Sequence, residues 1–139
     1  MVWPGEQESR RLTVARSRGN PQVVVLDLVG ELDDGTVLLL AREVALVLDR
    51  ESAPETVVVD LTAVRSVSAS GLRALHAAHA HATGKGIGFR LVVRENSRPA
   101  SVLDATKLRA VLDVYPSRAA ALAAGDRGRF VREMRALWT

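Results

Sequence analysis

The 139-residue chain has no cysteine, few aromatic residues and no long apolar run. A chain without cysteine forms no disulfide, holds no metal through thiolates and uses no cysteine nucleophile. None of its apolar stretches approaches the roughly 18 residues that a membrane-spanning helix needs, and the N-terminus lacks the apolar core of a signal peptide. We therefore expect a cytoplasmic protein with no membrane insertion.

The charges are nearly balanced, with 19 Lys and Arg against 16 Asp and Glu. The basic residues are scattered along the chain and form no stripe, and aromatic residues make up only 4% of it, too few for a platform on which bases stack. The composition therefore argues against direct binding of nucleic acid. The length and the hydrophobic content of 47% suit one globular domain with its own core.

The hydrophobic pattern predicts strands that alternate with helices after an opening hairpin. The expected elements are strands at 12–17 and 23–29, a helix from Val37 to about Leu48, a strand at 57–61, a helix from Ser68 to about Thr83, a strand near 89–93, a short helix capped by Ser97, a strand at 111–115 and a helix capped by Ser117. This order predicts an α/β fold with a mixed, mostly parallel sheet that is packed by about four helices.

The two ends of the chain differ in pattern from the part between them. Residues 1–10 are polar and predict a disordered lead-in, and residues 11–124 make up the expected domain. Residues 125–139 predict an amphipathic helical tail, with Phe130 and Trp138 on its apolar face. Such a face either docks on its own domain or contacts a partner, so a homodimer stays open.

The stretch from the third strand into the following helix carries the candidate site. Residues 57–61 are apolar with little interruption, which is typical of a strand buried on both faces. A polar turn is expected at 62–68, and Ser68 and Ser70 then stand where a helix begins, where a hydroxyl can cap free backbone N–H groups. The sequence thus places small hydroxyl residues at the carboxyl edge of a sheet, where open α/β proteins bind their ligands.

Three patterns with catalytic or metal-binding associations have simpler interpretations. The glycines at 84–88 close a helix and open a strand, whereas a phosphate loop does the reverse. The Ser68–Gly71 segment lacks the glycine that precedes the serine in a hydrolase nucleophile elbow. Of the three histidines, His76 and His79 share a helix side but His81 does not. We expect no catalytic residue, no metal and no cofactor.

Three motifs, in this order along the chain, resemble those of a known family. They are Gly30-Glu31-Leu32-Asp33 after the second strand, Asp60-Leu61 at the end of the third, and Ser68-Ala69-Ser70-Gly71-Leu72 at the start of a helix. Together they resemble the STAS domain, named after sulphate transporters and anti-sigma-factor antagonists. The likeness covers roughly residues 12–124 and agrees with the element order above.

A free-standing STAS domain resembles the bacterial anti-sigma-factor antagonists. The resemblance implies a partner that is an anti-sigma factor and also a serine kinase of the histidine-kinase-like ATPase type. Binding of the antagonist releases the sigma factor, and phosphate on the antagonist displaces the partner. The rival that the same resemblance allows is a structural subunit of a transport complex for lipids or anions.

The chain departs from the family pattern at the segment that carries the phosphorylated serine. The family's loop typically reads Asp-Ser-Ser-Gly, and its first serine takes the phosphate. Here Ser68 stands in place of the aspartate and Ala69 in place of the acceptor serine, whereas Ser70, Gly71 and the acidic Asp33 match. The resemblance then leaves three outcomes open: an antagonist that is permanently active, phosphate on Ser68 or Ser70 instead, or another partner.

The expected partner surface combines the loop at Asp33, the turn after the third strand and the start of the following helix. Its residues are Asp33, Thr62, Arg65, Ser66, Ser68, Ala69, Ser70, Gly71 and Arg73.

Overall fold

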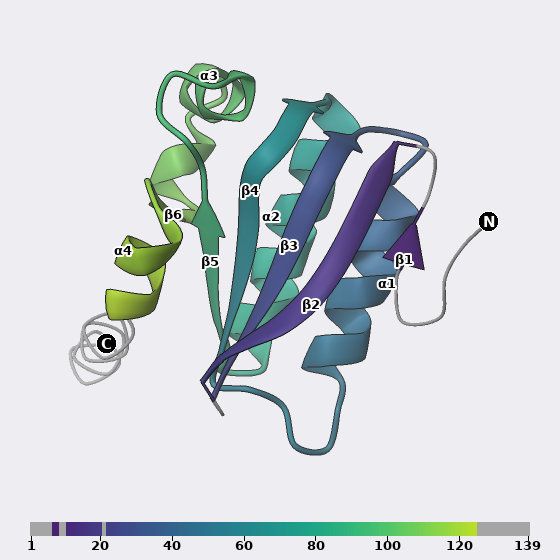
Figure 1. The fold of residues 1–139 in the computed structure, drawn as a ribbon, viewed down its shortest axis with the longest axis vertical. Helices are drawn as coiled ribbons and strands as arrows, with labels where there is room; N and C mark the ends of the chain where they lie inside the picture. Colours follow the sequence, from purple (N-terminus) through teal and green to yellow (C-terminus); the bar gives the residue numbers. More distant parts are fainter. Residues whose placement is uncertain (1–6, 9–10, 21, 125–139) are drawn as a thin grey trace.

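The computed structural model describes residues 7–8, 11–20 and 22–124, which form a six-stranded sheet with helices on both faces (Figure 1). The strands are β1 (Gln7–Glu8), β2 (Leu12–Asn20), β3 (Val23–Leu32), β4 (Thr56–Val67), β5 (Gly88–Val92) and β6 (Asp113–Tyr115). The helices are α1 (Val37–Leu48), α2 (Ala69–Gly84), α3 (Arg98–Ala105) and α4 (Arg118–Ala123), with a short 3-10 helix at Leu108–Ala110.

The strands lie in the sheet in the order in which they follow along the chain. The β1–β2 and β2–β3 pairs are antiparallel, whereas β3–β4, β4–β5 and β5–β6 are parallel. Helices α1 and α2 cover one face, and α4 packs on the other face near β5 and β6 (Figure 1). The predicted fold, a mixed and mostly parallel sheet with an opening hairpin and four helices, is confirmed for the described residues.

Strand β4 lies between two cores. Every residue from Thr56 to Leu61 is buried, as the apolar run predicts. Val57 and Val59 belong to the large core beneath α1 and α2, whereas Val58 belongs to a smaller cluster with Ala121 of α4. Alternate side chains of one strand therefore hold the helices of both faces.

The helix starts follow the capping rules on which the predictions relied. Ser68, Ser97 and Ser117 are N-caps whose hydroxyl oxygens accept hydrogen bonds from backbone N–H groups in the first turns of α2, α3 and α4. Among the described residues, no helix combines the length and the apolar character needed to cross a membrane.

The turn predicted at 62–68, after the strand at 57–61, is wrong at residues 62–67. That strand is β4, which continues to Val67, and β3 beside it continues to Leu32. The two strands stay paired through register shifts near Val29 and Glu31. These irregularities let Leu61, Val64 and Val67 all reach the large core although they are three residues apart. Because these buried residues are three apart, the segment lacks the two-residue alternation by which a strand is predicted from sequence.

Within the segment predicted as a lead-in, Gln7–Glu8 form β1 and pair with Val14 and Thr13 of β2. An edge strand offers unpaired backbone groups, and backbone pairing does not require apolar side chains. The rest of the lead-in, residues 1–6 and 9–10, and the predicted amphipathic tail at 125–139 lie outside the described residues.

Candidate functional site: a loop–helix corner

The start of α2 packs directly on the end of β3. The Ser68 N–H donates to the Leu32 carbonyl at 2.9 Å. Gly71 makes this approach close: a Cβ there would lie 2.7 Å from the Leu32 oxygen and 3.0 Å from Val67 Cγ1. Gly71 is buried, so its contribution to the corner is close packing of helix on strand, and it presents no side chain to a partner.

The loop that links β3 to α1 is held by its own polar side chains. Asp33 Oδ1 accepts a hydrogen bond from the Gly35 N–H at 2.9 Å, and its carboxylate takes both Nη atoms of Arg11, at 2.7 and 3.0 Å. The Thr36 hydroxyl donates to the Glu31 carbonyl at 2.8 Å and accepts from the Asp33 N–H. Asp33 therefore shapes the loop, and the bidentate Arg11 pair fixes it to the start of β2.

The same loop is tied to α2 through Asp34. The Ser70 hydroxyl donates a hydrogen bond to the Asp34 carboxylate, and Arg73 Nη2 donates to the Ser70 oxygen at 3.3 Å. Sequence reasoning selected Ser70 and Arg73 but missed Asp34, because the family pattern points to Asp33 alone. A second acidic residue directly after Asp33 was the sequence feature that could have pointed to Asp34.

Ala69, the first residue of α2, is exposed. The neighbouring Ser68 is half-buried and its hydroxyl oxygen accepts the Gly71 N–H at 3.2 Å, while the Ser70 hydroxyl is engaged with Asp34. Both serine hydroxyls therefore already have partners inside the protein, and the methyl group between them faces outward.

The predicted surface is brought together only in part. Asp33, Ser68, Ala69, Ser70, Gly71 and Arg73 meet at the corner formed by the loop and the first turn of α2. Arg65 and Ser66 lie near the end of β4, just before the start of α2, and Arg65 is exposed. Thr62 belongs elsewhere, because its N–H and hydroxyl donate to Asp60 Oδ1 at 2.9 and 2.7 Å.

A second polar cluster, which the sequence did not reveal, joins α4 to the sheet. Arg118 Nη2 lies 2.9 Å from both Asp60 Oδ2 and Asp27 Oδ2. Burial alone would raise the pKa of Asp60, but the two hydrogen bonds from Thr62 and the Arg118 guanidinium outweigh it and hold that pKa below its ordinary value. The cluster joins the first residue of α4 to β3 and β4.

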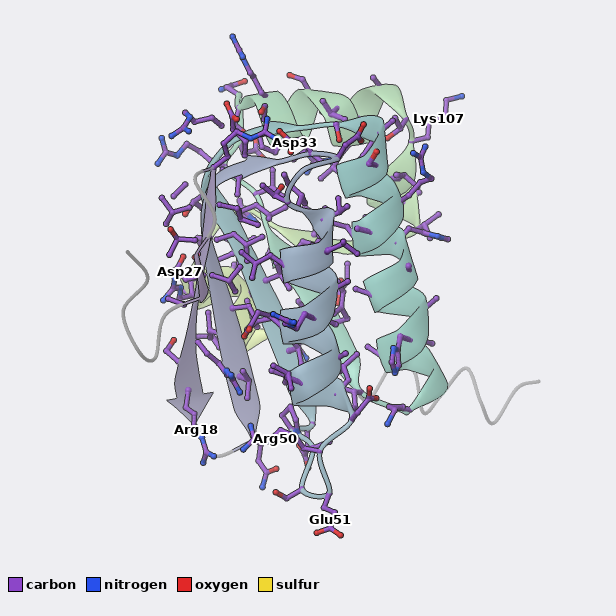
Figure 2. The ribbon with its side chains drawn as sticks, turned by 90° about the vertical axis from the view of Figure 1, so that its right-hand side faces the viewer. Arg18, Asp27, Asp33, Arg50, Glu51 and Lys107 are labelled. Atoms are coloured by element: carbon purple, nitrogen blue, oxygen red, sulfur yellow. The ribbon has the colours of Figure 1, made fainter. Side chains whose placement is uncertain are left out.

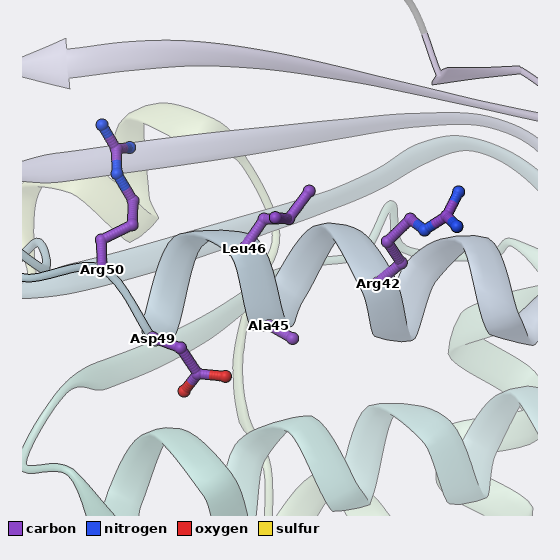
Figure 3. A pocket seen from close by; sticks show the side chains of 5 residues that line it. All are labelled: Arg42, Ala45, Leu46, Asp49 and Arg50. Carbon is purple, nitrogen blue, oxygen red and sulfur yellow. The ribbon is translucent and has the colours of Figure 1, made fainter.

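The far end of α1 carries an open hollow lined by Arg42, Ala45, Leu46, Asp49 and Arg50 (Figure 3). Asp49 there accepts from Lys85 and contacts His81 Nε2, both at 3.0 Å, and the hydrogen bond from Lys85 is the main reason why its pKa is lowered. Figure 2 shows the separation, with Asp33 at one end of the molecule and Arg50 and Glu51 at the other.

The three histidines of α2 do not converge. His76 is exposed, the ring of His79 meets Phe89 edge-on with centroids 6.1 Å apart, and His81 contacts Asp49. Within the ranges that the structure describes, no cluster of His, Asp or Glu side chains has the arrangement of a metal site.

The comparisons with known proteins show the family and the fold. Residues 15–121 match the family model of the STAS domain. An anti-sigma factor antagonist from Mycobacterium paratuberculosis, known from its crystal structure, is 28% identical with a TM-score of 0.73, over 83% of this chain and 94% of that one. No curated protein matches the chain.

Two further solved structures share the fold at lower identity. The anti-sigma factor antagonist SpoIIAA, in its unphosphorylated form, is 16% identical with a TM-score of 0.66, over 83% of this chain and 96% of that one. A sulfate transporter family protein from Wolinella succinogenes is 21% identical with a TM-score of 0.61, over 77% and 87% of the two chains. At these identities the likeness establishes the architecture alone.

The three motifs that suggested the resemblance all lie within the matched range, at the end of β3, within β4 and at the start of α2. The match covers most of the chain, and the order of strands and helices is the one that the resemblance implied. The chain therefore belongs to the STAS-domain family.

Proposed function

We propose that this protein is an anti-sigma-factor antagonist that binds an anti-sigma factor through the loop–helix corner and so releases a sigma factor. The observation that carries the proposal is the exposed Ala69 in the first turn of α2, next to Ser70, whose hydroxyl contacts Asp34 and Arg73. Support also comes from the antagonist of 28% identity, because it aligns over nearly its whole length.

The proposed partner is an anti-sigma factor of the histidine-kinase-like ATPase type, and the proposed place of action is the cytoplasm. In this scheme the chain contributes a binding surface and no catalytic residue. The switch would act on transcription by exchange of partners.

We further propose that the antagonist is permanently active, because Ala69 has no oxygen to phosphorylate. The two neighbouring serines are poor substitutes. The Ser68 hydroxyl caps α2, and a phosphate on Ser70 would place about −1.5 to −2 charges against the Asp34 carboxylate that the Ser70 hydroxyl now contacts. The geometry therefore favours the first of the three outcomes that the sequence left open.

Replacing Ala69 with glutamate should weaken binding of the anti-sigma factor by about tenfold or more, because a carboxylate would add repulsion beside Asp34 and occupy the contact. The measurement is titration calorimetry with each purified anti-sigma factor of the kinase-like ATPase type from the source organism. The matched control is Ala77→Glu, an exposed alanine on the same helix about 12 Å away. Equal affinities for Ala69→Glu and Ala77→Glu would show that the corner is not the interface.

Replacing Ala69 with serine should restore the missing switch. Incubated with the partner and labelled ATP, the Ala69→Ser variant is expected to take up phosphate and dissociate, whereas the natural chain takes up none. Phosphate on Ser70 of the natural chain would disprove permanent activity but keep the antagonist role. Co-purification with an ATP-binding transport subunit, and binding to no anti-sigma factor, would favour the transport-complex alternative instead.

A further inference from the structure

We propose that Leu38 anchors the anti-sigma factor by entering an apolar pocket on its surface, an inference that rests on the proposed function. Leu38 is 81% exposed, more than any other exposed large apolar side chain in the described part of the chain. Its neighbours Val37 and Leu39 pack against the large core, but Leu38 does not.

The exposed face of α1 is unusually apolar for a surface helix. The helix buries Leu40, Val44 and Val47 at helical spacing, as an amphipathic helix should. Its two charged residues do not give it a fully polar outer face, because Glu43 is buried and only Arg42 is exposed. A single exposed leucine needs no functional explanation by itself. The position of Leu38, described next, is what suggests a role in binding.

Leu38 lies at the rim of the loop–helix corner. It is the second residue of α1, which begins directly after the loop that contains Asp34. Asp34 contacts Ser70 in the first turn of α2, so the two helix starts are tied side by side at the same end of the molecule (Figure 2). Side chains of a helix lean toward its N-terminus, which directs Leu38 toward the end where Ala69 is exposed.

The charges around Leu38 define the chemistry of the partner. Arg42 lies one turn further along the same face of α1, and the described residues give it neither a hydrogen bond nor an ion pair. A partner that fits this surface has an apolar pocket for Leu38 and a carboxylate beside that pocket for Arg42. An aliphatic anchor in a pocket, with a polar rim around it, is an arrangement that suits a binding interface.

The same helix offers a natural control in Leu46. This leucine is also exposed, at 49%, but it lies eight residues further on, about 12 Å along the helix. Figure 3 shows it between Arg42 and Arg50 on α1, where these side chains line the hollow. Non-specific hydrophobic association through α1 would involve both leucines, whereas specific binding at the corner involves Leu38 alone.

The experiment compares Leu38→Ser with Leu46→Ser in the full chain, by calorimetry against the purified kinase-like anti-sigma factors. We expect Leu38→Ser to weaken binding by about tenfold or more and Leu46→Ser to change it by less than about twofold. Arg42→Glu should weaken binding by several-fold and reduce its dependence on salt. Thermal unfolding should be nearly the same for both leucine variants, because neither side chain belongs to a core cluster.

The outcomes separate this inference from the proposed function. If the natural chain binds an anti-sigma factor and Ala69→Glu abolishes binding, but Leu38→Ser binds normally, the anchor is disproved and the function stands. Equal losses for both leucine variants would also disprove it. A change from dimer to monomer in Leu38→Ser, seen by sedimentation with unchanged affinity, would assign Leu38 to a second copy of this chain. Binding to none of the anti-sigma factors would refute the proposed function itself.

Discussion

Replacing Gly30 with alanine is expected to lower the free energy of unfolding by about 3 kcal/mol or more. Gly30 has a φ of +126°, a backbone conformation that side chains rarely allow. A Cβ at this position would also lie 1.9 Å from the Arg11 carbonyl oxygen. Both effects act at once, and neither can be relieved by rotating a side chain, because the obstructing atoms are backbone.

The surrounding structure explains why β2 cannot simply move away. The Arg11 carbonyl accepts the Glu31 N–H at 2.7 Å, so displacing it breaks the hydrogen bond that joins the residue before β2 to β3. The Arg11 guanidinium also holds Asp33, which orders the loop before α1. The glycine that opens the Gly-Glu-Leu-Asp motif therefore sets the geometry of the candidate site as well as the stability of the sheet.

Chemical denaturation of the two proteins measures this effect, with Gly84→Ala as the control. Gly84 is the last residue of α2, and a Cβ there meets no atom within 4 Å. We expect Gly84→Ala to change the free energy of unfolding by less than about 1 kcal/mol, in the stabilising direction. If Gly30→Ala lost no more than about 1 kcal/mol, the positive φ and the close approach to Arg11 would not be required by the fold.

The parts of the fold that the sequence predicted are those in which local pattern and tertiary burial agree. The unbroken apolar run of β4 needs no partner to be recognised, and the same is true of the serine caps of α2, α3 and α4. The bounds of α1 follow because Leu40, Val44 and Val47 repeat at helical spacing.

The missed features depend on contacts between residues that are distant in the chain. The second half of β4 pairs with β3 through two register shifts, at each of which β4 has one residue more than β3, so its residues lack the regular alternation of a strand. The Ser70–Asp34 contact spans 36 residues, and that between Arg118 and Asp60 spans 58. No local pattern encodes such pairs. The resemblance supplied Asp33 but not the acid next to it, which holds Ser70.

Replacing Arg118 with methionine should lower the free energy of unfolding by about 1–3 kcal/mol at neutral pH, the second largest effect that we expect. Asp60 is 4% exposed, and Arg118 provides the cationic partner for its Oδ2 and for Asp27. Methionine keeps much of the length of the side chain but leaves the buried carboxylate without a countercharge. The effect stays at the lower end for buried ion pairs, because Arg118 is 40% exposed and water reaches it.

The matched control is Arg109→Met. Arg109 Nε lies 2.7 Å from Asp104 Oδ1, a contact as short as those of Arg118, but both side chains are exposed, at 39% and 62%. An ion pair of this kind contributes little, so the change in the free energy of unfolding should stay below about 0.5 kcal/mol. Similar losses for Arg118→Met and Arg109→Met would contradict a special role for the cluster of Asp27, Asp60 and Arg118.

The dependence of stability on pH gives a second test of the same cluster. The pKa of folded Asp60 lies below its ordinary value of 3.8, so its ionised form stabilises the fold above that pH. This contribution is lost as the pH falls through the folded-state pKa. In Arg118→Met the pKa of Asp60 rises, so the loss should begin at a higher pH than in the natural chain. Asp60→Asn should remove this part of the acid dependence altogether. An identical acid dependence in the natural chain and Arg118→Met would show that the two hydrogen bonds from Thr62, and not Arg118, keep Asp60 ionised.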